Sequence, residues 1–352
     1  MTTRSRTPSA LKVVAIGGGT GLSTLLRGLK HYVPSSPEDQ PRDPSLPVIS
    51  ELSGIVTVSD DGGSSGRLRR ELNVIAPGDV RNCIVALSED EALLSRLFRY
   101  RFVAGQLEGH NFGNLFLTAL ASVCGDFAEA VHVASEILAT RGKIYPATTS
   151  NVQLDAWMHD GTRVRGETNI TASNSRIVEL RMVPANAKPL PEALHAIEEA
   201  DLITIGPGSL FTSLIPNMLV RAIPVAIERS NAVKVYVCNL MTQANESLGL
   251  TAADHIRAIF HHARRKLFDY ALVNTSPASE ELLAKYALEG ASQIIADTDH
   301  IRELGVEPIS GDYLDETEIA RHATDRAAHD LLQLAVTGKN HGCSALSSRF
   351  SS

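Results

Sequence analysis

The chain has 352 residues, of which 43% are apolar and 21% charged, and its formal net charge is −7. This length allows one large domain or two ordinary ones, with enough buried surface to fold without disulfides or a structural metal. The acidic balance and the low aromatic content, 5%, argue against a nucleic-acid-binding protein. The four cysteines, at positions 83, 124, 238 and 343, have no metal or disulfide spacing and suit a reducing, cytoplasmic compartment.

The first part of the chain alternates short apolar runs with helical spacing, as in a parallel sheet covered by helices. Residues 1–10 are expected to form a disordered leader, and no apolar stretch reaches the roughly 20 residues of a membrane span. The pattern predicts strands at 12–16 and 54–58, with a helix over 22–31 and a proline-rich loop over 34–47 between them. Apolar spacing predicts four further helices, at 80–87, 92–98, 115–123 and 127–138.

From Lys143 the apolar and polar residues alternate, which predicts an insertion of strands and a hairpin over about 143–185. Later elements are predicted from short apolar runs and helical spacing: strands at 202–205, 223–227, 233–238, 270–273 and 293–295, and a closing helix over 316–336. Residues 338–352 are rich in Ser and Gly and are expected to form a disordered tail. The prediction is one α/β domain over residues 11–337, with a Rossmann-like, doubly wound and mainly parallel sheet.

A glycine-rich segment follows the first predicted strand and opens the next helix; it comprises Gly17, Gly18, Gly19, Thr20 and Gly21. Glycine lets the backbone approach a phosphate closely, and the helix N-terminus adds positive partial charge. The dinucleotide fingerprint G-x-G-x-x-G fails, because Leu22 or Thr24 occupies its third glycine position. The segment therefore indicates a phosphate or diphosphate loop, with a tight turn that binds nothing as the alternative.

The second predicted strand ends in a run of acids, glycines and serines: Asp60, Asp61, Gly62, Gly63, Ser64, Ser65, Gly66 and Arg67. The carboxyl ends of strands face the ligand crevice in doubly wound sheets, so an acid here can bind a ribose hydroxyl or a divalent cation. We assign only Asp60 as a candidate Mg²⁺ ligand, because adjacent side chains often point apart. A flexible polar turn is the alternative.

Residues at the start of predicted helices are further candidates for ligand binding or helix capping. The amides of Asn111 and Asn114 suit recognition of a base or sugar, and Asn111 is also a candidate helix cap. The neighbouring His110 is interpreted as a structural residue rather than a proton carrier. Asp79, at the start of another predicted helix, is interpreted as either an N-cap or a ligand-binding residue.

Two later strands end in a second glycine-rich turn and an amide, made up of Gly206, Pro207, Gly208, Ser209 and Asn239. Cys238, beside the amide, is interpreted as a core residue because no activating histidine lies near it in the sequence. The four strand-end segments, 17–21, 59–67, 206–209 and 238–239, are expected to share one crevice.

These motifs together resemble the YvcK-type gluconeogenesis factors of bacteria, within the wider CofD-like group. The matching stretches span about residues 12–332, and DDGGSSGR at 60–67 is the most specific. The resemblance implies a CofD-like fold and binding of a UDP-sugar such as UDP-N-acetylglucosamine, with roles in carbon metabolism, cell shape and peptidoglycan synthesis. It also associates two residues with that ligand: Tyr286, whose ring can stack on uracil, and Arg321, whose guanidinium can pair with a diphosphate.

The sequence supports two candidate functions. A regulatory protein that binds a nucleotide-sugar without turnover, and requires no cofactor, is favoured because the sequence offers loops but no acid–base pair or nucleophile. The alternative is a Mg²⁺-dependent transferase acting on a phosphorylated or nucleotidyl substrate, motivated by Asp60 and Asp61. NAD or another diphosphate nucleotide is a weaker candidate ligand. A regulatory protein partner, and a homodimer formed through the edge of the inserted hairpin, are further hypotheses.

Overall fold

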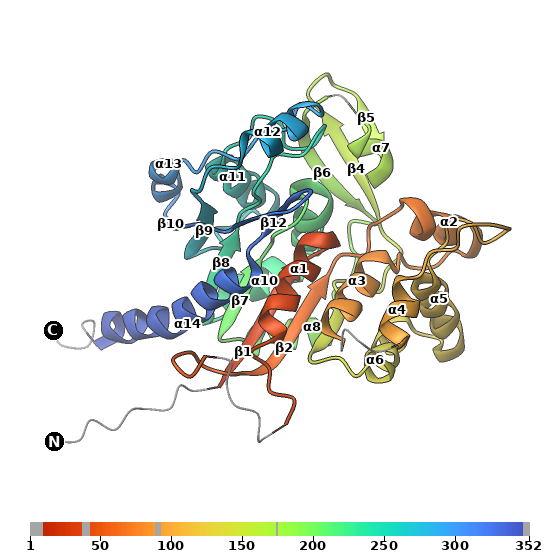
Figure 1. Ribbon diagram of the computed structural model, residues 1–352, viewed down its shortest axis with the longest axis horizontal. Helices are drawn as coiled ribbons and strands as arrows, with labels where there is room; N and C mark the ends of the chain where they lie inside the picture. Colours follow the sequence, from red (N-terminus) through yellow and green to blue (C-terminus); the bar gives the residue numbers. More distant parts are fainter. Residues whose placement is uncertain (1–9, 37–42, 89–92, 174, 348–352) are drawn as a thin grey trace.

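A computed structural model describes residues 10–36, 43–88, 93–173 and 175–347 (Figure 1). All of the predicted leader except Ala10 therefore lies outside the described residues. The centre of the molecule is a seven-stranded sheet in which every neighbouring pair of strands is parallel. In spatial order the strands are β10 (Glu307–Gly311), β9 (Tyr270–Asn274), β8 (Val233–Val237), β7 (Leu202–Ile205), β1 (Leu11–Gly17), β2 (Ile49–Val56) and β3 (Lys143–Pro146).

The order of the strands reverses at the middle of this sheet. From β1 the chain adds β2 and β3 on one side, and from β7 it adds β8, β9 and β10 on the other. The pairing of β1 with β7 is therefore a topological switch point, where ligands bind in doubly wound sheets, outside the carboxyl ends of the strands. The Rossmann-like α/β architecture predicted from the sequence is confirmed.

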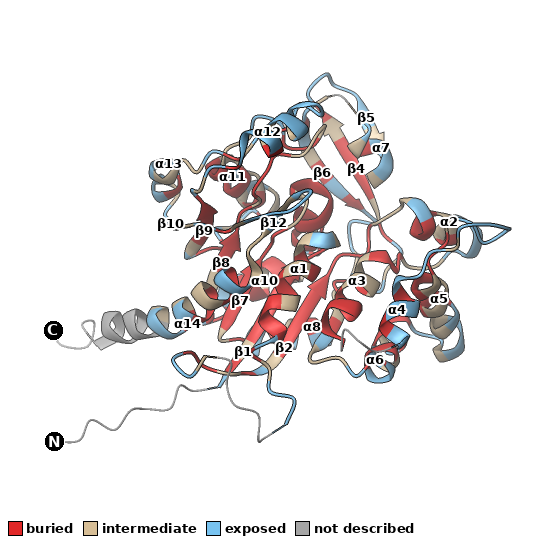
Figure 2. Ribbon diagram, in the orientation of Figure 1, coloured by how far each residue is buried: buried red, intermediate tan, exposed pale blue. Residues whose placement is uncertain are grey.

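Helices cover both faces of the sheet, which explains why its central strands are buried on both sides. Figure 1 shows α1 (Gly19–Lys30), α3 (Gly78–Leu87) and α14 (Thr324–Ser347) in front of it, and α8 (Pro191–Glu199) and α10 (Ala222–Arg229) behind it. In Figure 2 the buried residues concentrate in these strands and in the inner faces of these helices. No single helix of the described ranges is long and apolar enough to cross a membrane; one bent pair, Leu210–Leu219 with Ala222–Arg229, passes by length and composition only.

The predicted insertion of strands is a separate antiparallel sheet with the order β5 (Arg163–Arg165), β4 (Gln153–Met158), β6 (Ile177–Val183), accompanied by the short helix α7 (Glu167–Thr171). The strand at Lys143–Pro146 does not belong to it, because that strand pairs in parallel with β2 at the edge of the large sheet. Alternation alone cannot distinguish an edge strand of one sheet from the first strand of the next.

Several predicted elements are wrong. Residues 223–227 lie in helix α10, since a short apolar run is compatible with a buried helix, and Pro224 is tolerated in the first helical turn. Residues 293–295 form no strand and make only one bridge, from Gln293 to Met241. The closing helix α14 begins at Thr324, because residues 314–322 form a hairpin of β11 (Leu314–Glu316) and β12 (Ala320–His322).

The tail predicted as disordered is helical over residues 338–347, and residues 348–352 lie outside the described part. Extending an existing helix costs little once its first turn has formed, even through the glycines of this segment.

The remaining helices form groups on either side of the sheet (Figure 1). Beyond β2 and α3 lie α2 (Gly63–Leu72), α4 (Leu93–Arg99), α5 (Phe112–Cys124) and α6 (Phe127–Ile137). Toward β9 and β10 lie α11 (Ala252–Ala263), α12 (Glu280–Ala287) and α13 (Thr298–Glu303). Between β7 and α10 the chain forms a π-helical turn, η1 (Leu210–Leu214), and the short helix α9 (Ile215–Leu219).

Candidate functional site

A cavity of about 560 Å³ lies at the carboxyl ends of β1, β7 and β8, at the topological switch point. Three of the four predicted strand-end segments meet there, and their lining residues are Gly18, Gly19, Thr20, Gly21, Pro207, Gly208, Ser209 and Asn239. Gly17 and Gly206 lie just behind this lining, at the ends of their strands. Segments almost 200 residues apart in sequence thus form one concave site.

The two glycine-rich turns approach so closely that side chains would separate them. A Cβ atom on Gly21 would lie 2.5 Å from the carbonyl oxygen of Pro207, and one on Gly18 would lie 2.6 Å from Cγ2 of Thr57. Gly206 has a φ of 88°, in the region that favours glycine. Gly21 therefore serves close packing of one turn on the backbone of the other, and Gly18 leaves room for the side chains of Thr57 and Asp79; this packing shapes the floor of the cavity.

Asn239 fixes the second turn. Its Oδ1 accepts a hydrogen bond from the N–H of Gly208 at 3.0 Å, and its Nδ2 donates to the carbonyl oxygen of Gly208 at 2.8 Å. Its amide, which the sequence analysis treated as a ligand contact, is thus engaged with the backbone. Ser209 lies next to it, and its Oγ accepts a hydrogen bond from Nε2 of Gln243 at 2.9 Å.

The start of helix α1 opens into the same cavity. Its N-cap is Gly18, which has no side chain to bond the first helical N–H groups. The N–H of Gly19 donates to the carboxyl group of Asp79, while Thr20 and Gly21 line the cavity itself. An N-terminus of this kind attracts an anion, because its N–H groups and the helix dipole carry positive partial charge.

Asp79 is not the N-cap of α3, as one interpretation of the sequence held. The cap is Pro77, and Asp79 lies in the first turn, half-buried against the Gly18–Gly19 backbone. Burial, followed by the charge of Asp60, raises the pKa of Asp79 to about 7. The side chain therefore changes its charge close to neutral pH, at the back of the phosphate-type loop.

Three glutamates that the sequence analysis missed line the cavity: Glu289, and two whose pKa values are raised, Glu167 and Glu246. Burial, followed by the charge of Asp60, raises the pKa of Glu167 well above its usual value. Burial raises the pKa of Glu246 to about 7, although its Oε1 accepts hydrogen bonds from the N–H groups of Phe211 at 2.6 Å and Thr212 at 3.0 Å. No motif marks either residue; the one sequence signal for Glu246 is its position in the loop that follows β8.

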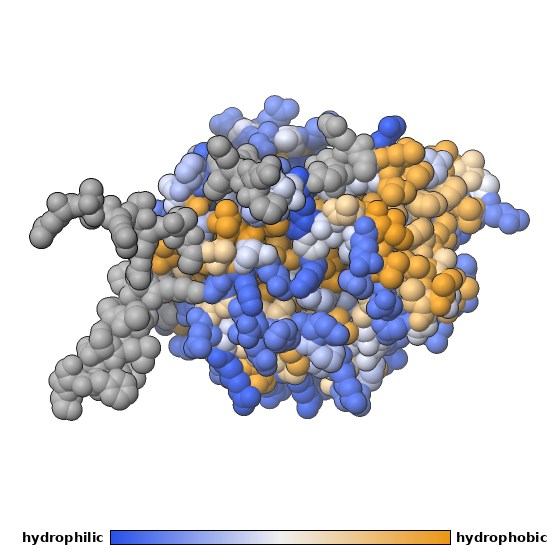
Figure 3. Space-filling view, turned by 90° about the horizontal axis from the view of Figure 1, so that it is seen from below, coloured by the Kyte–Doolittle hydropathy of each residue, from blue (hydrophilic) through white to orange (hydrophobic). Residues whose placement is uncertain are grey.

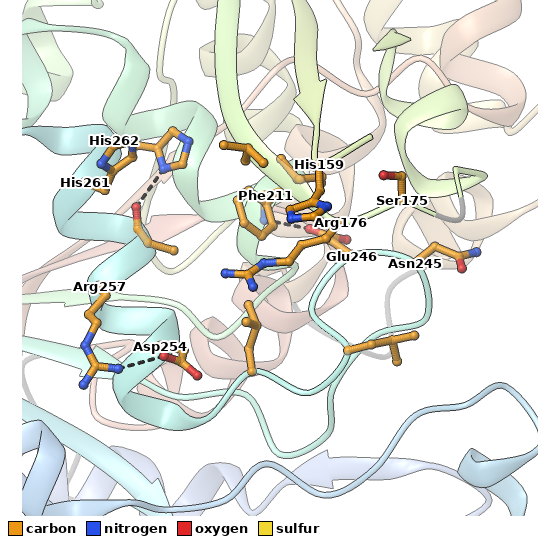
Figure 4. Close-up of a pocket in the computed structure, with 15 residues that line it drawn as sticks. His159, Ser175, Arg176, Phe211, Asn245, Glu246, Asp254, Arg257, His261 and His262 are labelled. Carbon is orange, nitrogen blue, oxygen red and sulfur yellow. Dashed lines mark hydrogen bonds and ion pairs between the residues drawn. The ribbon is translucent and has the colours of Figure 1, made fainter. Parts of the chain in front are cut away.

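Glu246 also borders a second cavity of about 620 Å³, lined by residues of β6, α11 and the loop before α11 (Figure 4). The wall there is mixed: Figure 4 shows the rings of Phe211 and His262 beside the cationic side chains of Arg176 and Arg257. The Arg257 guanidinium donates to Asp254 at 2.7 Å, so part of this charge is already paired. Glu246 thus separates two cavities and ties the loop between them to η1.

The run at residues 60–67 does not share the first cavity, which corrects the expectation of a single crevice. It turns from β2 into helix α2, which leads away from the switch point, and Asp61, Gly62, Gly63 and Gly66 line a separate hollow of about 740 Å³. As expected, the two acids point apart. Asp60 Oδ1 accepts from the N–H of Gly62 at 2.9 Å, whereas Asp61 accepts from the N–H of Thr168 at 2.8 Å in helix α7.

The serines and Arg67 of this run bind α5 and the loop before it. Ser64 Oγ lies 3.2 Å from Nδ1 of His110, and Ser65 Oγ accepts from Nδ2 of Asn114 at 3.4 Å. Arg67 donates to the carbonyl oxygen of Glu108 at 2.6 Å. Asn111 caps α5, accepting from the N–H of Asn114 at 3.1 Å. These residues, predicted to contact a ligand, lie apart from the first cavity and join α2 to α5.

The two residues taken from the family resemblance differ in position. Tyr286 lines the first cavity, and its hydroxyl accepts a hydrogen bond from the N–H of Ala320 at 3.2 Å. Arg321, the residue that follows Ala320, is exposed on β12 and does not line the cavity. Its neighbours Ala320 and His322 do line it. Burial lowers the pKa of His322 to about 4, so this ring is neutral at the cavity wall.

A metal centre is not preformed. Within the described ranges no three or more His, Cys, Asp or Glu side chains gather in a way that could hold a metal ion. Asp60, the candidate Mg²⁺ ligand, lies at the turn into α2 with one oxygen bonded to the Gly62 N–H. The residues present do not fit a metal site made of protein ligands alone.

Comparison with known proteins agrees with this fold. The sequence profile of a family described as "2-phospho-L-lactate transferase CofD" matches residues 13–314. The chain is 46% identical over 324 residues to a gluconeogenesis factor of Halalkalibacterium halodurans, covering 91% of this chain and 95% of that protein. It is 43% identical over 325 residues to the gluconeogenesis factor of Bacillus subtilis, covering 92% and 98% respectively.

Among solved structures, a crystal structure of a UPF0052 family member from Bacillus halodurans is similar with a TM-score of 0.85 and 45% identity, covering 92% of this chain and 99% of that one.

Proposed function

Because this chain belongs to the CofD family and, within it, to the gluconeogenesis factors, we propose that it is a regulatory protein that binds a nucleotide-sugar in the cavity between residues 18–21 and 206–209. One observation carries the proposal: the N-terminus of α1, which has glycine as its cap, lines this cavity together with a second glycine-rich turn that packs against it. Such an N-terminus favours an anion such as a phosphate group.

The donors around the cavity match a UDP-sugar such as UDP-N-acetylglucosamine. The backbone at Thr20 and Gly21 and the side chains of Ser209, Thr212 and Ser213 line the cavity together. The Thr212 hydroxyl is hydrogen-bonded to Glu246. The ring of Tyr286 at the far wall offers a stacking surface for a base. A volume of about 560 Å³ falls within the range of small-molecule sites.

On this proposal the protein responds to the level of a cell-wall precursor in the cytoplasm. It would connect carbon metabolism during gluconeogenic growth with cell shape and peptidoglycan synthesis, through a protein partner that recognises the ligand-bound form. Binding alone requires a preformed cavity and no proton transfer, which suits a site whose polar groups largely fix the loops.

A specific observation favours a second candidate function, group transfer. Asp79 and Glu246, which flank the phosphate-type loop and the cavity, have pKa values raised to about 7, the range suited to general acid–base catalysis. The matching family is itself described as a transferase. Because a protein-only metal site does not fit, we derive no metal-dependent step. A diphosphate nucleotide such as NAD is the weaker alternative ligand.

Calorimetric titration with UDP-N-acetylglucosamine tests the binding proposal. We expect saturable binding to the wild type, lost in Gly21→Ala because the new Cβ pushes the two turns apart, and retained in Gly161→Ala, whose Cβ meets no atom within 4 Å in a distant hairpin. A folded wild type that does not bind would refute the proposal. Phosphorus NMR of the same mixture with a phosphorylated acceptor, with and without Mg²⁺, separates the two functions: new signals that vanish in Asp79→Asn would establish transfer.

A further inference from the structure

Helix α5 has an unusual composition for its position. Its sequence, FGNLFLTALASVC, contains no charged residue, yet one side of it lies at the surface. Ala119 and Val123 on this side are exposed, and Phe116 and Leu120 are only half-buried. A helix that is apolar on every side is normally buried, yet no segment of the described residues covers the outer side of α5.

Helix α4 extends this apolar surface. Phe98 of α4 packs against Phe112 and Phe116 of α5, with ring centroids 6.1 and 5.0 Å away, so the two helices form one unit. Seven large apolar side chains are exposed on this unit and on the loop that joins its helices: Leu93, Leu94, Leu97, Tyr100, Val103, Leu107 and Val123. Figure 3 shows the resulting hydrophobic surface at the end of the molecule that carries these helices.

The size of this face suits an interface between two chains. The seven side chains are on average a little over half exposed and form an apolar surface on the order of several hundred Å². The largest apolar patch on a typical monomer is about 300–600 Å², and a stable interface buries about 800 Å² on each partner. The half-buried residues of α5 supply the remaining area.

The charges around the face are arranged so that two copies of the chain, related by a two-fold axis, would bring opposite charges together. Arg99 and Arg101 lie beside the N-terminal end of α5, where the N–H of Phe112 donates to the carbonyl oxygen of Tyr100 at 2.9 Å. Asp126 and Glu129 lie just beyond its C-terminal end. A two-fold axis across the middle of α5 would make the helix antiparallel to its copy and bring the basic end of each chain to the acidic end of the other.

We propose that the outer face of α4 and α5 is the interface of a homodimer of this chain. This face lies away from the edge of the inserted hairpin, which the sequence analysis considered for dimerisation. It also lies apart from the cavity at residues 18–21, so the proposal does not depend on the proposed function. A second copy is the occupant that meets the area, the apolar composition and the paired charges together.

Sedimentation equilibrium at tens of micromolar, a range that populates dimers of micromolar affinity, tests the proposal. The chain mass is 37.8 kDa, and we expect the wild type to sediment with twice that mass. The double variant Ala119→Arg/Val123→Arg should sediment as the monomer. Arginine is a good helix former and is favourable near a helix C-terminus, so the helix itself should persist.

The matched control is Leu288→Arg, which places the same charge on a side chain that is 88% exposed, outside the α4–α5 face. It should remain dimeric. Equal circular dichroism and melting temperatures of the two variants would show that dissociation is not unfolding. A monomeric wild type, or a double variant that stays dimeric, would overturn the proposal.

Discussion

Two of the three glycine-rich segments, residues 17–21 and 60–67, follow neighbouring strands of the large sheet but have different surroundings. Residues 18–21 line the cavity at the switch point, together with residues 207–209. Residues 62–66 open helix α2 and line a separate hollow beside Arg69 and Arg70. By composition the second hollow, with its arginines, is the more obvious phosphate site.

One of the two arginines that line that hollow, Arg69, is engaged by the protein. Arg69 donates to the carbonyl oxygens of Ser59 and Asp60, each at 3.1 Å, and also to Val152 and Asn151. It holds the end of β2 against the start of the insertion. At the first segment, by contrast, the start of α1 has no side-chain cap. Donors that lack protein partners, rather than glycine or arginine content, identify a binding site.

The largest effect that separates the two segments should come from Gly66→Ala. A Cβ there would lie 1.7 Å from the carbonyl oxygen of Asp61, which no small adjustment relieves, so we expect a loss of more than about 3 kcal/mol in the free energy of unfolding. At Gly63 a Cβ meets nothing within 4 Å, and Gly63→Ala should lose only about 1 kcal/mol, because of its φ of 45°. Urea unfolding measures both, and equal losses would contradict this packing role.

The buried carboxyl groups distinguish the first region by their dependence on pH. The pKa of Glu246 is about 7 in the folded chain against an ordinary 4.5, so the folded state binds the extra proton between these values. The free energy of unfolding contributed by this group therefore falls as pH rises through that window, by on the order of 3 kcal/mol.

Glu246→Gln keeps an oxygen that can accept from Phe211 and Thr212 but does not titrate. Urea unfolding at about pH 5 and about pH 8 should show a smaller decrease of stability for the variant than for the wild type. An identical decrease in both proteins would mean that Glu246 is charged in the folded state at both pH values.

The smallest effects concern the two residues that the family resemblance associates with the ligand. Tyr286→Phe removes the hydroxyl that accepts from the Ala320 N–H but keeps the ring at the cavity wall, so affinity for UDP-N-acetylglucosamine should fall about fivefold to tenfold. Arg321→Ala should leave affinity within about twofold, because this exposed side chain does not line the cavity. Calorimetry measures both, and a larger loss in Arg321→Ala would show that the arginine reaches the bound ligand.

Sequence reasoning succeeded where a local pattern determines the structure. The strands at Leu11–Gly17 and Leu202–Ile205 are continuous apolar runs ended by glycine, and both turns after them line the cavity. It failed where the outcome depends on distant partners. Residues 223–227 are as apolar as a strand, but they form helix α10, which packs on the sheet instead of joining it.

The residues of the candidate site also divide into those that a local sequence pattern predicts and those that depend on distant segments. Glycine-rich turns are visible in the sequence, but the raised pKa values of Asp79 and Glu246 result from burial by segments far away in the chain. The serines of 64–65 and the amides of Asn111 and Asn114 read as ligand contacts, and the fold uses them to join α2 with α5. Their residue types indicate hydrogen bonding, and only the tertiary structure identifies the partner.

A crystal structure of this chain with UDP-N-acetylglucosamine tests the central claim most directly. The account predicts ligand density in the cavity at the switch point, with the diphosphate against the N–H groups of Thr20 and Gly21 and the hydroxyl of Ser209, and the base near Tyr286. Density in the hollow beside Arg69 and Arg70 instead, or no density in a crystal soaked to saturation, would contradict it.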